Sequence, residues 1–288
     1  MLNRVAIIGV GLLGGSFSLA LRERQLVKEV VGVCRRSSQS ELATQIKVID
    51  KAYGTAAEAV VGADLVVLAT PMLTMATVLK EIQPHISSQC ILTDVGSVKG
   101  CLQELLHNDF PEMVEQFVLA HPIAGGEKSG VSAARADLFV DKHVVLTDTE
   151  QCSSNNVNVV GQLWKACGAN IVKMTSQQHD SVFAYTSHLP HVIAYTLVNN
   201  LHQQPNSEQL FDFASAGFYD FTRIASSEPI MWRDICLSNK SEVLKSIQTF
   251  STQLQALTDA IESDDKTALA EIFIDAKHAR DEGLISKG

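Results

Sequence analysis

The stretch HPIAGGEKSG, at residues 121–130, carries the side chains of this sequence that are best suited to proton transfer. It places one imidazole, His121, beside two adjacent glycines and the charge pair Glu127–Lys128. An imidazole titrates near neutral pH, so it can take a proton from a substrate and return it. The apolar residues 117–120 predict a strand just before it. Because open α/β sheets bind ligands at the carboxyl ends of their strands, we expect His121 to lie in a ligand site.

A cofactor site is predicted by the glycines that follow the first strand pattern. Residues 4–8 predict a short strand, GVGLLG follows at once, and a helical pattern comes next. In this context Gly9 permits a tight turn, Gly11 lets a pyrophosphate approach the backbone, and Gly14 lets helix and strand pack closely. The amino terminus of the helix then faces the phosphates. The residues expected to bind a dinucleotide here are Gly9, Gly11, Leu12, Leu13 and Gly14.

The choice between NAD and NADP depends on the end of the next predicted strand, residues 29–33. NAD-preferring sites usually carry an acidic residue about 20 residues after the glycine motif, where it accepts hydrogen bonds from the ribose hydroxyls. Here Cys34 occupies that position, and Arg35, Arg36 and Ser37 follow it. Arginines and a serine can bind a 2′-phosphate. Alternatively, these residues form a solvated basic turn that binds no cofactor. The sequence favours NADP and leaves NAD open.

Two further strand ends could contact a ligand, and the first of them should lie near the nicotinamide. Residues 64–69 predict a buried strand that ends at Thr70 and Pro71, because proline stops a strand. Residues 89–93 predict another strand, which leads to Ser97. Ser97 either caps the helix that follows or contacts a ligand.

The second half of the sequence is helical. Strands alternate with helices up to about residue 173, which predicts a doubly wound, mainly parallel α/β sheet. Residues 241–261 carry apolar side chains at alternating spacings of four and three, typical of a long helix that packs along another helix. We therefore expect a dinucleotide-binding domain, residues 1–173, and an all-α domain, residues 174–288. By analogy of fold, the second domain supplies a substrate cleft and a dimer interface.

His188 and His191 lie three residues apart, on one face of the helix predicted at residues 178–201. Pro190 should kink that helix or start a new one. No carboxylate stands at the spacing of a zinc-binding HExxH motif, so we expect no metal.

The composition disfavours several classes of function. A net charge of −9 repels nucleic acids and anionic membranes, and the apolar runs are shorter than the roughly 20 residues of a membrane span. The six cysteines are widely spaced, and the sequence shows no secretory signal. We therefore expect free thiols and a cytoplasmic protein.

Five segments together resemble the prephenate dehydrogenase family, also called cyclohexadienyl or arogenate dehydrogenases. They are GVGLLGGS (9–16), TDVGSVKG (93–100), HPIAGGEKSGV (121–131), TSHLPHVIA (186–194) and DFTRIASSEPIMWRDI (220–235). The resemblance implies a Rossmann-type domain followed by a helical dimerisation domain. It also implies a homodimer that acts in tyrosine biosynthesis and reduces NAD or NADP. The reaction would convert prephenate to 4-hydroxyphenylpyruvate and CO2, or arogenate to tyrosine and CO2.

The same resemblance assigns roles to single residues. His121 matches the catalytic histidine, which accepts the proton of the C4 hydroxyl as hydride leaves, and Ser97 matches the serine that bonds this hydroxyl. Arg223 matches the arginine that holds a substrate carboxylate, a task suited to a planar bidentate donor. The other matched residues line or gate the pocket: His191 with His188 in support, Trp232, and Glu127 and Asp220, which pair with the arginine.

Two other functions stay open at this point. A dehydrogenase of β-hydroxy acids on the same two-domain plan would use a lysine, for which Lys99 and Lys128 are the candidates near strand ends. A catalytically silent dinucleotide sensor would not require His121, Ser97 and Arg223 to share one cleft.

Overall fold

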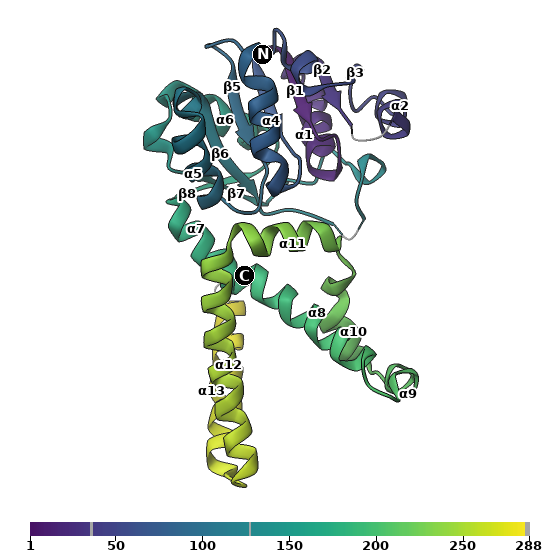
Figure 1. The fold of residues 1–288 in the computed structure, drawn as a ribbon, viewed down its shortest axis with the longest axis vertical. Helices are drawn as coiled ribbons and strands as arrows, with labels where there is room; N and C mark the ends of the chain where they lie inside the picture. The colour runs from purple at the N-terminus through teal and green to yellow at the C-terminus, as the bar shows by residue number, and fades with distance from the viewer. Residues whose placement is uncertain (35–36, 127, 286–288) are drawn as a thin grey trace. The chain divides into compact units, whose positions relative to one another are not determined.

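The computed structural model describes residues 1–34, 37–126 and 128–285. The chain forms two compact units, Met1–Lys240 and Ser241–Gly288 (Figure 1). Three residues of the predicted site, Arg35, Arg36 and Glu127, lie outside the described residues.

The first unit is built on an eight-stranded sheet with the order β3-β2-β1-β4-β5-β6-β7-β8. Its strands are β1 (Leu2–Ile8), β2 (Val27–Val33), β3 (Lys51–Tyr53), β4 (Leu65–Leu68), β5 (Ile91–Asp94), β6 (Phe117–Pro122), β7 (His143–Thr147) and β8 (Asn170–Met174). Neighbouring strands are parallel except β6 and β7, which are antiparallel. The expected doubly wound, mainly parallel sheet is confirmed. The sequence did not indicate β3, because three residues are too few for a periodic pattern.

Helices cover both faces of this sheet, as the alternation along β1 requires. Val5 and Ile7 belong to one core cluster and Ala6 and Ile8 to another, and all four are nearly inaccessible to solvent. The first cluster includes buried side chains of α1 (Leu12–Glu23), α2 (Ser37–Gln45) and α6 (Ser154–Ala166). The second includes those of α3 (Ala56–Val60), α4 (Met75–Ile82) and α5 (Gly100–Asp109). Both faces of the sheet are therefore buried, as is usual for parallel sheets.

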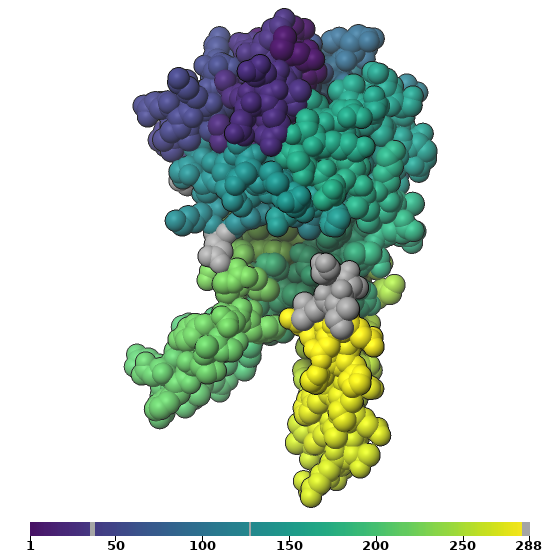
Figure 2. All heavy atoms as spheres, turned by 180° about the vertical axis from the view of Figure 1, so that it is seen from behind, coloured from purple at the N-terminus to yellow at the C-terminus, as the bar shows by residue number. Residues whose placement is uncertain are grey.

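Among the described residues, Trp164 of α6 is the largest fully buried side chain, and it packs against the helix that follows the glycine motif. Its ring centroid lies 4.4 Å from that of Phe17 on α1 and 5.0 Å from that of Phe139. The view from behind shows the purple surface of the first residues adjoining the teal surface of later residues of the same unit (Figure 2). This packing fixes the glycine loop to the rest of the sheet.

The helices after β8 continue the same compact unit. A capping box at Thr175 and Gln178 starts α7 (Ser176–Phe183), which passes through a π-helical turn, Ala184–His188, into α8 (Leu189–His202). Pro190 lies in the first turn of α8, where it lacks an N–H and its ring cannot fit against the carbonyl four residues earlier. The wider π turn accommodates this proline. The expected irregularity at Pro190 is confirmed. The remaining elements are α9 (Ser207–Asp212), α10 (Ala216–Thr222), the 3-10 turn Arg223–Ser226 and α11 (Pro229–Ser238).

The second unit is a helical hairpin. A short turn at residues 263–265 joins α12 (Lys240–Glu262) to α13 (Lys266–Ile285), so the long helix expected at residues 241–261 is confirmed. Several apolar residues of its stripe are exposed in the single chain, among them Phe250, Leu254 and Ile261. No helix among the described residues is long and apolar enough to cross a membrane.

Candidate active site

The glycine loop between β1 and α1 has the geometry of a phosphate cradle. Gly9 has a φ of +101°, and a Cβ there would lie 2.5 Å from the carbonyl oxygen of Ala69. A Cβ on Gly14 would lie 2.6 Å from the oxygen of Gly9, so both positions require glycine. At Gly11, by contrast, no heavy atom of the described residues lies within 4 Å of a Cβ. Gly11 is also the N-cap residue of α1 and provides no side-chain cap, which leaves the first N–H groups of the helix available to an anion. This loop fits the pyrophosphate of a dinucleotide.

Thr70 and Pro71 lie beside this loop, after β4. A Cβ on Gly9 would come within 3.1 Å of the backbone nitrogen of Thr70, so the two loops are in contact. Cys34, at the end of β2, is half-buried, and burial raises the pKa of its thiol. It is therefore a neutral group at the position where NAD-preferring sites carry a carboxylate. Ser37 is the first residue of α2, and its side chain is not described.

A chain of three side chains connects β6 to α7. Nδ1 of His121 lies 2.7 Å from Nε2 of His179, and Nδ1 of His179 lies 2.7 Å from Oδ1 of Asp180. A carboxylate only accepts, so a neutral His179 donates its Nδ1–H to Asp180 and presents Nε2 as an acceptor. That acceptor takes the Nδ1–H of His121. The chain therefore leaves Nε2 of His121 with its lone pair, which is the form that a general base needs.

Asp180 is itself fixed by the amino terminus of α5. Its carboxylate oxygens accept hydrogen bonds from the backbone N–H groups of Lys99, at 2.9 Å, and of Gly100, at 2.8 Å. A Cβ on Gly100 would lie 2.8 Å from Oδ2 of Asp180, so the helix end approaches the carboxylate closely. These two hydrogen bonds hold the carboxylate at the positive end of the helix dipole.

The electrostatic surroundings keep His121 neutral. Burial lowers the pKa of His121 well below its ordinary value of 6.5, and repulsion by the protonated forms of His179, Lys99 and His188 lowers it further. Burial also lowers the pKa of His179, although the hydrogen bond to Asp180 opposes this effect. Phe183 contributes to the apolar surroundings, because its ring centroid lies 5.0 Å from that of His121 and 4.5 Å from that of His179. Both imidazoles are therefore neutral at neutral pH.

Ser97 lies on the loop between β5 and α5, and a buried ion pair ties this loop to the strand that carries His121. Lys99 pairs with Asp94, and both side chains are fully buried. The ammonium of Lys99 also donates to the carbonyl oxygen of Ala120 at 2.8 Å, while Oδ1 of Asp94 accepts from the N–H of Ala120 at 3.0 Å. Both backbone polar groups of Ala120, the residue just before His121, are thus hydrogen-bonded to this ion pair. Ser97, partly buried, belongs to the same framework.

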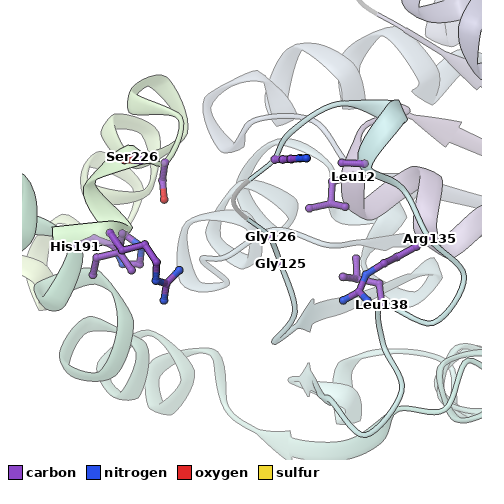
Figure 3. A pocket seen from close by; sticks show the side chains of 12 residues that line it. Leu12, Gly125, Gly126, Arg135, Leu138, His191 and Ser226 are labelled. Atoms are coloured by element: carbon purple, nitrogen blue, oxygen red, sulfur yellow. The ribbon is translucent and has the colours of Figure 1, made fainter. Parts of the chain in front are cut away.

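A cavity of about 650 Å³ extends from the glycine loop to the helices after β8. It is lined by Leu12 of α1, by Gly125, Gly126, Lys128, Ala133, Arg135 and Leu138 of the segment after β6, and by His191, Arg223, Ile224, Ser226 and Ser227. In Figure 3, His191 and Ser226 lie on one side, Leu12, Arg135 and Leu138 on the other, and Gly125 and Gly126 between them. One cavity therefore adjoins both the cofactor loop and two of the predicted substrate residues.

Stacked rings position the histidines of α8 and its π turn. The ring of His191 stacks on Trp232 of α11 with centroids 3.5 Å apart, and its Nδ1–H donates to the carbonyl of Ser187 at 2.9 Å, which leaves Nε2 as an acceptor. Burial lowers the pKa of His191, and the charge of Arg223 lowers it as well. The pKa of the buried His188 falls to about 4, mainly through burial. Trp232 thus supports His191, whereas Asp220 is exposed on α10 and is not among the described residues that line the cavity.

A dinucleotide cradle, a neutral histidine base and a cationic cavity on a doubly wound sheet define a nicotinamide-dependent dehydrogenase. Comparison with known proteins makes the class specific. Residues 17–173 match the family model described as "Prephenate dehydrogenase, nucleotide-binding domain", and residues 175–275 match "Prephenate dehydrogenase, dimerization domain". The chain belongs to the prephenate dehydrogenase family.

Relatives of known name and structure agree over nearly the whole chain. The sequence is 34% identical to prephenate dehydrogenase of Bacillus subtilis, over 98% of this chain and 76% of the relative. It is 32% identical to cyclohexadienyl dehydrogenase of Zymomonas mobilis, over 96% and 95%. The crystal structure of prephenate dehydrogenase from Aquifex aeolicus, in complex with hydroxyphenyl propionate and NAD+, superposes with a TM-score of 0.90 at 35% identity, covering 98% of each chain.

Sequence reasoning missed His179 and Asp180. Both fall in the helical stretch predicted at residues 178–201, but nothing in their spacing indicates that they reach a strand almost 60 positions earlier. The only signal is an adjacent His–Asp pair near a helix start, which is too common to be specific.

Proposed function

We propose that this protein catalyses the oxidative decarboxylation of prephenate to 4-hydroxyphenylpyruvate and CO2, with reduction of NAD(P), as a step of tyrosine biosynthesis. The observation that carries the proposal is the Asp180–His179–His121 chain in a member of this family. It provides a neutral, oriented base, and abstraction of a hydroxyl proton during hydride loss needs such a base.

The reaction removes a hydride from C4 of the substrate and a proton from the hydroxyl oxygen bound to C4. When bound, the nicotinamide supplies the hydride acceptor for C4 of the substrate. Nε2 of His121 takes the proton of the C4 hydroxyl, and the hydroxyl of Ser97 bonds the same oxygen and holds it in place. Carbonyl character then develops at C4, the ring carboxylate leaves as CO2, and its electron pair makes the ring aromatic. His121 returns its proton to the phenolic oxygen, so the histidine is neutral again for the next turnover.

The charges of the cavity support prephenate over arogenate. Among the described residues that line it, the charged ones are the cations Lys128, Arg135 and Arg223. Prephenate is a dianion, whereas arogenate carries an additional ammonium group that these cations would repel. Arg223 binds a substrate carboxylate in this proposal, and Nε2 of His191 accepts a hydrogen bond beside it. Trp232 and His188 hold His191 in place, and Glu127 and Asp220 pair with Arg223 at the entrance.

NADP is the cofactor we propose as preferred. Gly9, Gly11, Leu12, Leu13 and Gly14 cradle the pyrophosphate, and Thr70 and Pro71 lie towards the nicotinamide. Arg35, Arg36 and Ser37 bind the 2′-phosphate in this proposal. Support comes from the neutral thiol of Cys34, because a carboxylate there would repel that phosphate.

We also propose a functional division after residue 173, with the dinucleotide bound by residues 1–173 and the substrate residues and dimer interface supplied by residues 174–288. The exposed apolar stripe of α12 supports a homodimer, since large exposed apolar surface marks an interaction site. Six free cysteines agree with a reducing, cytoplasmic setting. Light scattering after gel filtration tests the dimer, which a monomer at micromolar concentration would contradict.

The decisive experiment crosses prephenate and arogenate with NAD and NADP and follows the absorbance of the reduced nicotinamide. We expect prephenate with NADP to give the highest kcat/KM. The variant His121→Asn should lose about 10² to 10⁴-fold in kcat and keep its affinity for the dinucleotide, because it removes only the base. The matched control is His107→Asn, since His107 is exposed on α5 and bonds the carbonyl of Gln103 in its own helix. Wild-type turnover in His121→Asn would refute the proposal.

The alternative functions fit the site less well. A dehydrogenase of β-hydroxy acids needs a lysine that reaches its substrate, yet Lys99 is fully buried and paired with Asp94. A silent sensor has no use for a base whose tautomer is fixed by two further side chains.

A further inference from the structure

Arg135 is a cation of the cavity to which the proposed reaction assigns no hydrogen bond with substrate or cofactor. It follows the 3-10 turn Val131–Ala133, in the segment after β6, and its side chain is 58% exposed. Figure 3 shows it on the side of the cavity opposite His191, beside Leu138. It therefore lies away from the residues to which the substrate carboxylate is assigned.

The backbone of Arg135 is hydrogen-bonded to α1, the helix that follows the cofactor loop. Its N–H donates to Oγ of Ser16 at 3.0 Å, and Ser16 is fully buried on α1. A Cβ on Gly15 would lie 2.9 Å from Cβ of Ala134, so the two segments are in close contact. Leu12, the first residue of α1, lines the same cavity as Arg135. The guanidinium group and the amino end of α1 therefore adjoin one space.

We propose that Arg135 binds the pyrophosphate of the dinucleotide. The N–H groups of the glycine loop and the dipole of α1 provide about half a positive charge for this group, which carries two negative charges. A guanidinium supplies a full charge and two parallel donors to phosphate oxygens. The inference rests on the dinucleotide binding proposed above and adds a residue that the glycine motif does not contain.

The ion pair of Arg135 with Asp137 does not prevent this role. The nitrogen and oxygen atoms are 3.5 Å apart, and both side chains are more than half exposed. Exposed pairs of this kind hold weakly. A pyrophosphate has more negative charge and more acceptor atoms than one carboxylate, so it competes successfully for the guanidinium.

Direct binding measurements on the full chain, without substrate, test the inference. NADH is titrated by its own fluorescence, and ADP-ribose and adenosine by calorimetry. Arg135→Gln should weaken NADH and ADP-ribose each about tenfold, as expected for loss of one charged hydrogen-bonding group, and leave adenosine unchanged. Arg135→Lys should recover part of the loss. The control Arg24→Gln removes the same charge at the other end of α1 and should bind like the wild type.

Three results would overturn the assignment. The first is an Arg135→Gln variant that binds NADH and ADP-ribose with wild-type affinity. The second is a loss confined to NADPH, which would place Arg135 at the 2′-phosphate, and the third is a rise only in KM for prephenate at saturating dinucleotide. The backbone bond from residue 135 to Ser16 remains in every variant, so each variant should fold. Thermal melting checks this. A wild-type chain that binds no dinucleotide would refute the proposed function itself, and this inference with it.

Discussion

Substitution of His179 tests whether the buried histidine controls the base that it contacts. His179→Leu removes the acceptor of the Nδ1–H of His121 and leaves that group buried without a partner. The unpaired donor favours the other tautomer, in which Nδ1 is bare and Nε2 carries the proton. A histidine in that form cannot accept the substrate proton through Nε2. We therefore expect kcat to fall although His121 itself is present.

The magnitude follows from the hydrogen bond that is lost. A buried polar group left without its partner costs about 1–3 kcal/mol. If the loss affects only the reactive form of His121, kcat should fall by about 5- to 150-fold, at about 1.36 kcal/mol for each factor of ten. This is less than the loss expected for His121→Asn, because His121 remains able to react in its minor tautomer.

The matched variant His179→Gln separates positioning from packing. Its amide oxygen can still accept the Nδ1–H of His121, so it should recover much of the activity. It also removes a group that lowers the pKa of His121 when it is itself protonated, at low pH. The base must be neutral to act, so activity is lost as pH falls through its pKa. In the wild type this acidic limb lies well below pH 6.5, and in His179→Gln it should move upward.

Steady-state kinetics over a range of pH, with NADH titration as a check on cofactor binding, measures all of these quantities. The reasoning is wrong if His179→Leu keeps wild-type kcat, or if both variants lose activity equally with an unshifted acidic limb. The second result would indicate that His179 only fills space.

Three further perturbations follow from the same structure. Arg223→Ala should raise KM for prephenate by about 10- to 100-fold through loss of a charged bidentate contact, whereas an unchanged KM would remove Arg223 from the site. Trp164→Ala should lower the free energy of unfolding by about 3–5 kcal/mol in urea titrations, since it leaves a cavity against Phe17, and a loss below 1 kcal/mol would contradict this packing. Lys99→Met should cost about 3–5 kcal/mol by leaving Asp94 buried and unpaired, and the double variant with Asp94→Asn should be more stable than Lys99→Met alone.

Local patterns were sufficient to predict the strands that carry the site. The glycine motif after β1 and the buried runs of β4, β5 and β6 are continuous in the sequence, so periodicity and turn residues locate them. The short strand β3 gave no such pattern, and the turn chemistry near Pro190 indicated an irregularity without specifying a π turn. His121, Ser97 and Arg223 could be named because each stands within a recognisable segment.

The partners of His121 could not be predicted in this way, because they come from elements that meet only in the folded chain. His179 and Asp180 lie in the middle of α7, and Asp180 bonds the amino-terminal end of α5 while His179 bonds His121 of β6. The tautomer of the base therefore depends on how α7 packs against the sheet. Since α7 leads directly into α8, which carries His191, the same packing that orients the base also positions a substrate-side residue. A shift of α7 would disturb proton transfer and substrate binding together, so variants at this contact should change kcat and KM in concert rather than one alone.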